Sequence, residues 1–433
     1  MNSEWKEFLI EDFGEILTGT TPNTKRQEYY GGEYKFISPA DLDNGRYVTT
    51  AHKFITNEGL KVCRTLPKHS ILIGCIGNIG KMGMTNDEIS AFNQQINAII
   101  CNNQFIPDFI YYLILYNKPI LEKSSVKTTL PILNKGNFQK IKLNAPQLSE
   151  QCKIAYILST LQKAIEQQDK LIKHTTELKK ALMQKLFTEG TKSEKQKETE
   201  IGWVPESWEV VRLGTAVKLK GGFAFKSEEG IPDSDVQLIR MGNLYQNKLA
   251  LERAPIFYPE RYKKDFENYI LSEGDLVMSL TGTMGKEDYG FTVKIPKTTK
   301  TLLLNQRIAK FEIIDKEIDK DYLKQYLLSR VFLDKLYKTA KGTKQANLSS
   351  NEMKSLLLLK PKLDEQLEIA NALGNLEQKI IFHEKKKQIL SDLFKTLLHE
   401  LMTGQRRVNE IDFEALEATY IMNEMPLRMV AEE

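Results

Sequence analysis

The feature that most constrains this chain of 433 residues is that its sequence repeats itself once. Short blocks near the start return in the same order in the second half. The matched blocks are Trp5, Phe13-Gly14 and Thr18-Gly19-Thr20 with Trp208, Leu213-Gly214 and Lys220-Gly221-Gly222; Phe36-Ile37 with Leu238-Ile239; Gly77-Asn78-Ile79-Gly80-Lys81 with Gly282-Thr283-Met284-Gly285-Lys286; Asn93-Gln94-Gln95-Ile96 with Asn305-Gln306-Arg307-Ile308; and Pro146, Leu148 and Glu150-Gln151 with Pro361, Leu363 and Glu365-Gln366. A solenoid needs at least three repeats, so two copies predict a pseudo-dimer within one chain.

The first part of each copy mixes short strand-like runs with glycine and proline. Ser70 to Cys75 and Leu276 to Leu280 are β-like runs, whereas Pro107 to Leu115 and Asp321 to Leu328 are helical. This mixture is typical of a compact α+β domain.

The second part of each copy has a heptad pattern of apolar residues. The positions are Ile154, Leu158, Leu161, Ile165, Ile172, Leu178, Leu182 and Leu186 in the first copy, and Ile369, Leu373, Leu376, Ile380, Leu390, Phe394, Leu397 and Leu401 in the second. A helix of this length is too long to bury its seam against one small domain, so we expect the two helices to pair. An approximate two-fold axis would make them antiparallel, with one globular domain at each end. Gly190 and Gly404 are candidate C-terminal stops.

Gln168 and His383 interrupt the two seams at equivalent positions. One interpretation is that both are tolerated polar residues facing solvent. The alternative is that they form a polar layer that fixes the antiparallel register of the helices.

These patterns predict an α+β fold in which two pseudo-repeated globular α+β domains are separated by two long antiparallel coiled-coil helices. We expect the segments to be 1–146 (first domain), 147–190 (first helix), 191–202 (linker), 203–360 (second domain), 361–404 (second helix) and 405–433 (acidic tail).

Composition narrows the class of protein. The chain is 41% hydrophobic and 27% charged, values that exclude collagen-like and disordered classes. No apolar run is long enough to span a membrane and the N-terminus does not resemble a signal peptide, so we expect a cytoplasmic protein with its four cysteines reduced. The net charge of +4 hides an uneven distribution, because both domains carry excess positive charge and the residues after 360 carry excess negative charge. Nucleic acid is therefore a candidate partner.

Catalytic motifs are missing from the sequence. Gly74 to Lys81 superficially resembles a phosphate-binding loop, but its spacing is one residue too long and Met82 stands where a hydroxyl is needed. No zinc, nucleophile-elbow, dinucleotide or adenine-methyltransferase motif is present. We therefore expect no catalytic residue, no metal site and no bound cofactor, and we favour a binding scaffold over an enzyme.

The loops carry side chains suited to phosphates and base edges. Each loop alone is typical of a polar surface, and the Gly-x-x-Gly-Lys segments are typical of a tight turn between strands, with an exposed lysine, Lys81 or Lys286, at its tip. Their recurrence at equivalent places nevertheless favours DNA contact. The candidates are Thr20, Thr21, Lys25, Arg26, Asn78, Lys81 and Lys127 in the first domain, and Lys226, Arg240, Thr283, Lys286, Lys341 and Lys344 in the second. We also expect Arg240 to be exposed.

Three stretches of the chain resemble the specificity subunit of type I restriction-modification systems. They are Thr18 to Pro22 with Glu28 to Gly32 and Phe36 to Leu42; Ile201 to Pro205 with Trp208 to Gly214; and Pro146 to Gln151 with Ile154 to Leu158, echoed from Pro361. The second domain lacks the Thr-Pro and Tyr-Tyr-Gly-Gly elements of the first, as expected if the two domains read different sequences.

The resemblance implies a non-catalytic subunit that binds double-stranded DNA. It implies two modification subunits as partners, which bind S-adenosylmethionine and methylate adenine, and restriction subunits that use ATP and Mg to translocate and cleave DNA. The target would be bipartite and asymmetric. The alternatives are a coiled-coil adaptor without DNA function and a DNA-modifying enzyme with an unrecognised site.

Apolar residues beside the main seams suggest where partner helices dock. Leu178, Leu182, Leu393 and Leu398 add more apolar area than two helices can cover. We expect them to bind the modification subunits, unless the recognition domains fold back over them.

Overall fold

The structure is a computed structural model, and it describes residues 5–126, 130–339, 342 and 344–408. The contacts divide the chain into two compact units. Unit 1 consists of residues 1–171 and 383–433, and unit 2 of residues 172–382. The boundaries expected from the sequence remain a prediction.

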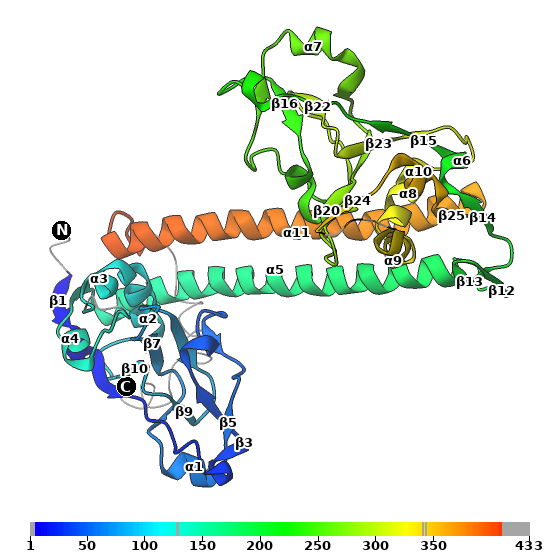
Figure 1. The fold of residues 1–433 in the computed structure, drawn as a ribbon. Coiled ribbons are helices and arrows are strands. Elements are labelled where there is room, and N and C mark those ends of the chain that lie inside the picture. Colours follow the sequence, from blue (N-terminus) through cyan, green and yellow to red (C-terminus); the bar gives the residue numbers. More distant parts are fainter. Residues whose placement is uncertain (1–4, 127–129, 340–341, 343, 409–433) are drawn as a thin grey trace. The chain divides into compact units, whose positions relative to one another are not determined.

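Unit 1 contains an α+β domain built on three sheets (Figure 1). A five-stranded sheet has the order β2-β10-β7-β8-β4, a four-stranded sheet the order β5-β3-β9-β6, and a third pairs β1 with β11. The strands are β1 (Lys6–Leu9), β2 (Gly14–Thr18), β3 (Tyr30–Ile37), β4 (Tyr47–Val48), β5 (Phe54–Ile55), β6 (Thr65–Leu66), β7 (Ile71–Gly74), β8 (Met82–Thr85), β9 (Ser90–Phe92), β10 (Ile96–Cys101) and β11 (Lys142–Ala145).

Unit 2 repeats this topology. Its four-stranded sheets have the orders β15-β23-β19-β21 and β17-β16-β22-β18, and β14 pairs with β25. The strands are β12 (Gln196–Thr199), β13 (Gly202–Pro205), β14 (Glu209–Arg212), β15 (Val217–Gly221), β16 (Val236–Ile239), β17 (Phe257–Tyr258), β18 (Ile270–Leu271), β19 (Leu276–Ser279), β20 (Thr281–Thr283), β21 (Thr292–Lys294), β22 (Thr301–Leu304), β23 (Ile308–Ile313), β24 (Gln345–Asn347) and β25 (Leu357–Lys360).

The match extends to strand direction, because β3 pairs with β9 and β16 with β22 in parallel while the neighbouring pairs are antiparallel. The expected duplication of an α+β domain is confirmed.

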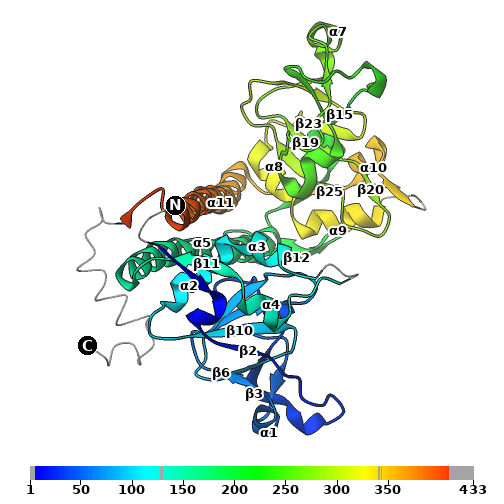
Figure 2. The same cartoon turned by 90° about the vertical axis from the view of Figure 1, so that its left-hand side faces the viewer.

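Helices complete each unit. In unit 1 they are η1 (Ile10–Phe13), η2 (Gln27–Tyr29), η3 (Pro39–Asp41), α1 (Asn57–Lys61), α2 (Pro107–Tyr116), α3 (Lys118–Lys123) and α4 (Lys135–Gln139). In unit 2 they are α6 (Leu213–Ala216), η4 (Ser227–Glu229), η5 (Met241–Asn247), α7 (Tyr262–Asp265), η6 (Glu267–Tyr269), α8 (Lys320–Leu327), α9 (Arg330–Thr339) and α10 (Ser350–Ser355). Figures 1 and 2 show α1 at the end of the first domain remote from the long helices, and α7 in the same position in the second.

The two long helices are α5 (Leu148–Glu189) and α11 (Leu363–Thr403). Both end at a glycine with φ +69°, Gly190 and Gly404, a left-handed conformation that terminates a helix. In unit 1 the first half of α5 lies beside the last half of α11, and in unit 2 the last half of α5 lies beside the first half of α11, so the pair is antiparallel (Figure 1).

The core of each unit joins the domain to the long helices. In unit 1, α2 lies between α5 and the sheet that contains β10 (Figure 2), and its buried Phe109 and Ile110 share a core with Ile154 and Leu158 of α5. In unit 2, Tyr322 of α8 shares a core with residues of both long helices. The seams therefore bury part of their apolar surface against the domains as well as against each other.

The stretch expected to be a linker, residues 191–202, contains β12 and the first residue of β13. β12 and β13 form an antiparallel hairpin in which Lys197 faces Val204 and Glu198 faces Trp203. Its start is fixed by Thr191, whose backbone N–H donates to Glu365 at 2.8 Å. The low apolar content of the stretch concealed a hairpin whose second strand carries the apolar residues.

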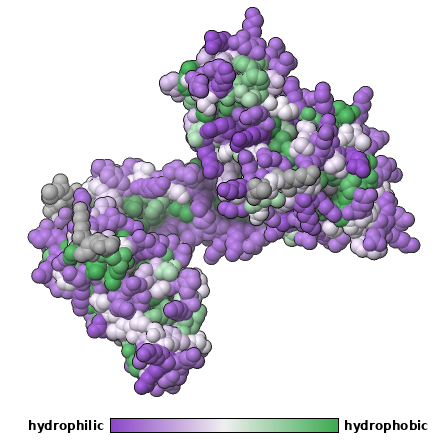
Figure 3. All heavy atoms as spheres, viewed as in Figure 1, coloured by the Kyte–Doolittle hydropathy of each residue, from purple (hydrophilic) through white to green (hydrophobic). Residues whose placement is uncertain are grey.

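Figure 3 shows that the visible face is mainly hydrophilic, with scattered apolar patches. In the part of the chain that the structure describes, no helix is long and apolar enough to cross a membrane.

Candidate nucleic-acid interface

In each domain we call the loop that follows β2 or β15 the first recognition loop. It begins where two backbone segments cross closely. A Cβ on Gly19 would lie 2.1 Å from the carbonyl oxygen of Asn93, and a Cβ on Gly222 would lie 2.2 Å from that of Asn305. The next residue then donates its backbone N–H at 3.0 Å to the residue before the asparagine. Glycine is required at both positions because a side chain would collide with the backbone carbonyl oxygen. The two loops leave their respective sheets at equivalent places.

In unit 1 this loop presents polar and cationic groups. Thr21 donates a hydrogen bond to Gln94, and Thr20 accepts one from the backbone N–H of Arg64 at 2.8 Å. Arg26 and Lys25 are exposed, and the Arg26 guanidinium lies 5.7 Å from the ring centroid of Tyr29.

Arg64 was not among the candidates from sequence. Its guanidinium donates to the carbonyl of Thr18 at 2.6 Å, which holds it beside the loop. Its position, far along the chain after α1, gave no local signal.

In unit 2 the corresponding loop is apolar where it leaves the sheet. Phe223 and Phe225 lie in a cluster of aromatic rings, with centroid distances of 4.9 to 6.1 Å to partners Tyr258, Tyr262, Phe266 and Tyr269. Lys226 follows the cluster and is exposed. The two loops thus share an origin and differ in chemistry.

The Gly-x-x-Gly-Lys segments differ between the copies. In unit 1 the segment is the expected tight turn, since β7 pairs with β8 and Gly80 has φ +78°. Asn78 is exposed on this turn, but Lys81 is half-buried, with its Nζ 3.5 Å from the carbonyl oxygen of Pro39. The expectation that Lys81 is an exposed lysine at the tip is wrong, because it already belongs to the paired end of the hairpin.

In unit 2 the equivalent segment is not a simple turn between neighbouring strands. Thr281–Thr283 forms β20, which pairs with β24. At the equivalent place in unit 1 the pairing is an isolated β-bridge between Ile76 and Ile132. The extra pairing brings Thr283 close to Lys344, two candidates that are far apart in sequence.

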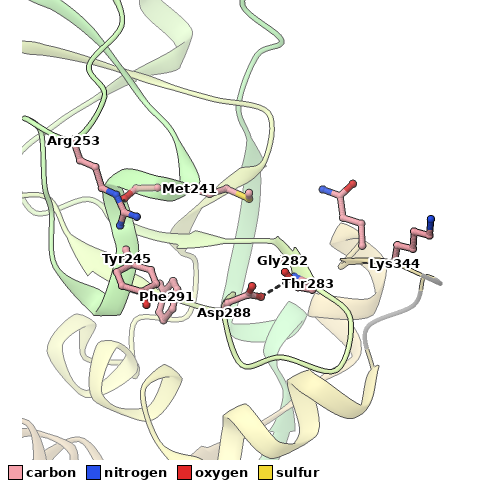
Figure 4. A pocket seen from close by; sticks show the side chains of 10 residues that line it. Met241, Tyr245, Arg253, Gly282, Thr283, Asp288, Phe291 and Lys344 are labelled. Carbon is pink, nitrogen blue, oxygen red and sulfur yellow. Dashed lines mark hydrogen bonds between the residues drawn. The ribbon is translucent and has the colours of Figure 1, made fainter. Parts of the chain in front are cut away.

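Thr283 and Lys344 line a hollow of about 430 Å³ (Figure 4). Figure 4 shows Arg253 and Tyr245 at one side of it and Lys344 at the other. The Arg253 guanidinium lies 4.8 Å from the ring centroid of Tyr245, and Asp288 accepts a hydrogen bond from the backbone N–H of Thr283 at 2.7 Å. Two exposed cations and an exposed aromatic face therefore surround an open hollow, an arrangement suited to nucleic acid. Sequence reasoning missed Arg253.

The remaining cationic candidates fall into three groups. Lys286 is exposed near the hollow, two residues before Asp288. Arg240 was expected to be exposed, but it is half-buried and its guanidinium donates to the carbonyl of Ala254. Lys127 and Lys341 lie outside the described residues.

The four leucines proposed as a partner surface separate into two pairs. Leu178 is 56% exposed and Leu393 is 42% exposed. Leu182 and Leu398 instead pack against the cores of units 2 and 1, respectively. These two leucines are therefore partly buried within their own units, and their role in partner binding stays a prediction.

Gln168 and His383 meet within unit 1. Nδ1 of His383 and Oε1 of Gln168 lie 2.8 Å apart, and one residue further along α5 Asp169 forms an ion pair with Lys387 at 2.5 Å. Gln168 is buried, so the polar contact lies between the helices rather than in solvent.

No group of three or more His, Cys, Asp or Glu side chains in the described part of the chain could hold a metal ion. All four cysteines are free thiols. Burial raises the pKa of the Cys75 thiol to about 11.

Comparison with known proteins supports a relationship along most of the chain. The family model described as "Type I restriction modification DNA specificity domain" matches residues 2–174 and 205–391. The chain is 29% identical over 422 residues to the type I restriction enzyme MjaVIII specificity subunit of Methanocaldococcus jannaschii, covering 95% of each chain. It is 26% identical to the MjaIX specificity subunit of the same organism, covering 94% of this chain and 95% of the relative.

The fold has a counterpart among solved structures. The crystal structure of a type I restriction-modification system S subunit from M. genitalium superposes with a TM-score of 0.63 at 15% identity, covering 93% of this chain and 97% of that one. The matched residues come from both units of this chain.

Proposed function

This chain belongs to the type I restriction-modification DNA specificity family, and from that premise we propose how its two domains read DNA. It is a specificity subunit: it recognises the DNA target and is not itself catalytic. The resemblance inferred from the sequence is therefore confirmed, and the adaptor and enzyme alternatives are set aside.

We propose a bipartite and asymmetric target. The observation that carries this proposal is that two domains of one topology start their recognition loops at the same backbone crossing but present different side chains there, Thr20 and Thr21 in one and Phe223 in the other. Two domains of the same topology whose loops carry different side chains would recognise different half-site sequences. Bases between the half-sites would not be contacted, and half-sites on one face of the duplex lie roughly 34–36 Å apart.

Each domain has its own set of proposed DNA contacts. In the first they are Thr20, Thr21, Lys25, Arg26 and Asn78, with Arg64 added from the structure. In the second they are Lys226, Thr283, Lys286 and Lys344, with Arg253 added. The cations would neutralise phosphates, whereas Thr21 with Gln94 and Thr283 offer hydrogen bonds to base edges.

We propose two modification subunits and additional restriction subunits as partners. S-adenosylmethionine, ATP and Mg would be bound by these partners and not by this chain. Leu178 and Leu393 are the exposed apolar positions proposed for helix docking. The Gln168–His383 contact is proposed to fix the register of the helices.

Substituting the proposed contacts of one domain at a time tests this assignment. In the complex with the modification subunits, Thr21→Ala together with Arg26→Ala should relax specificity at one half-site only, and Thr283→Ala with Lys344→Ala at the other only. Methylation of libraries randomised at one half-site at a time is the measurement. Equal loss at both half-sites from either double variant would contradict the division of labour.

A further inference from the structure

Each long helix is attached to its domain by a buried glutamine in its first turn. Gln151 of α5 is 2% exposed and Gln366 of α11 is fully buried. The two residues occupy equivalent positions in the repeat.

Both glutamines make the same three hydrogen bonds. Oε1 of Gln151 accepts from the backbone N–H of Ile106 at 3.0 Å, and its Nε2 donates to the carbonyls of Pro146 and Gln104 at 3.0 and 3.4 Å. Every polar atom of the side chain is engaged. The glutamine thereby joins the start of α5 to the segment directly before α2.

The second copy reproduces this clamp. Oε1 of Gln366 accepts from the N–H of Asp319 at 2.9 Å, and its Nε2 donates to the carbonyls of Pro361 and Glu317, both at 2.8 Å. Asp319 caps α8, the counterpart of α2. The same connection has been kept while the surrounding side chains changed.

In unit 2 a second attachment lies further along the long helix. Glu377 accepts hydrogen bonds from Lys324 and Gln325 of α8 at 2.6 and 3.1 Å. Gln366 and Glu377 are three turns apart on α11, about 16 Å at 1.5 Å per residue.

Two separated points of attachment fix a direction. One point alone would allow the domain to pivot on the long helix, whereas two points, one at the start of α8 and one within it, hold the axis of α8 against α11. The direction matters only if the two domains must meet half-sites at a set separation.

We propose that Gln151 in the first domain, and Gln366 with Glu377 in the second, are positioning residues that set the angle of each recognition domain on its helix and thereby the number of unread base pairs between the half-sites. This inference rests on the proposed bipartite function. The residues do not touch DNA, so they would act on spacing and not on the sequence of either half-site.

The test compares spacer preference in the complex with the modification subunits. Gln366→Met and Gln151→Met retain side-chain length and remove the three hydrogen bonds. Exposed glutamines on the same helices, Gln378→Met and Gln167→Met, are the matched controls. Methylation rates are measured on duplexes that carry both half-sites with the native spacer or with one base pair more or fewer.

We expect the preference for the native spacer to fall about tenfold in the clamp variants, because the loss of buried hydrogen bonds allows the domain to pivot. The controls should keep the wild-type ratio, and the half-site sequences should be unchanged. A clamp variant that loses activity in equal proportion at all three spacers would overturn the inference, since that pattern shows only a structural role.

If Gln366→Met does not yield soluble protein, Glu377→Gln takes its place in the same measurement. The first domain already carries a glutamine at this position, so the substitution is compatible with the fold. A wild-type ratio in this variant would likewise refute the positioning role. If the wild-type complex itself shows no two-part target, the proposed function fails instead, and the two failures are distinguishable.

Discussion

Acidification is expected to destabilise unit 2 through Glu377. This carboxylate joins α11 to two other helices: Lys324 of α8 donates to it at 2.6 Å, and Lys179 of α5 at 3.2 Å. Burial raises the pKa of the Glu377 carboxyl, but the charges of Lys179 and Lys324 and the hydrogen bonds from Lys324 and Gln325 outweigh burial and lower the pKa to about 2.

The sign and size of the effect follow from that pKa. Because the folded-state pKa lies below the ordinary value of 4.5, ionised Glu377 stabilises the fold above about pH 4.5, and the contribution is lost as pH falls toward 2. The difference corresponds to an upper bound of about 3 kcal/mol. Burial lowers the pKa of Lys179 in spite of Glu377, so part of the gain is offset by the cost of burying that ammonium group. We therefore expect about 2 kcal/mol.

The assay compares wild type with Glu377→Gln by urea unfolding between pH 7 and pH 2.5. Using the difference between the two proteins removes the titration of the other carboxylates. The wild type should be more stable at pH 7 by about 2 kcal/mol, and this advantage should shrink steadily below pH 4.5. A difference in unfolding free energy that stays constant with pH would refute the assignment.

Four further predictions concern the loops and the helices. Gly19→Ala and Gly222→Ala should each cost about 1–3 kcal/mol and lower the melting temperature, because the new methyl group meets a backbone carbonyl, whereas Gly221→Ala, with open space around its Cβ position, should not. Lys344→Ala should weaken DNA binding by the complex at all sequences and reduce the slope of log affinity against log salt by about 1, while Lys385→Ala on α11 should leave the slope unchanged. Leu178→Glu and Leu393→Glu should reduce co-purification with the modification subunit; full assembly with both variants would remove these leucines from the interface. Deleting one heptad from both long helices should change the number of unread base pairs and leave both half-sites intact, and an unchanged spacer would argue against a ruler role.

The repeat made most of the fold predictable. Equivalent sequence blocks became equivalent strands, and the heptad pattern of apolar residues became α5 and α11 with glycines at their ends. These features depend on local pattern and on the duplication, both of which are visible in sequence. The hairpin of β12 and β13 was missed because the polar first strand is ordered by its partner, not by its own composition.

The candidate interface was only partly predictable, since it depends on where side chains meet. Lys81 and Arg240 read as exposed cations in sequence, yet each binds a backbone carbonyl of a neighbouring segment. Arg64 and Arg253 carry no motif, and only folding brings Arg64 beside Thr20 and places Arg253 in the lining of the same hollow as Thr283. Long-range contacts of this kind leave no periodic signal.

The central claim, that one chain reads two different half-sites at a fixed separation, is tested most directly by mapping methylated adenines in DNA modified by the assembled complex. The account predicts two dissimilar half-sites separated by a constant number of unread base pairs. A continuous target, a palindromic target or a variable spacer would contradict it.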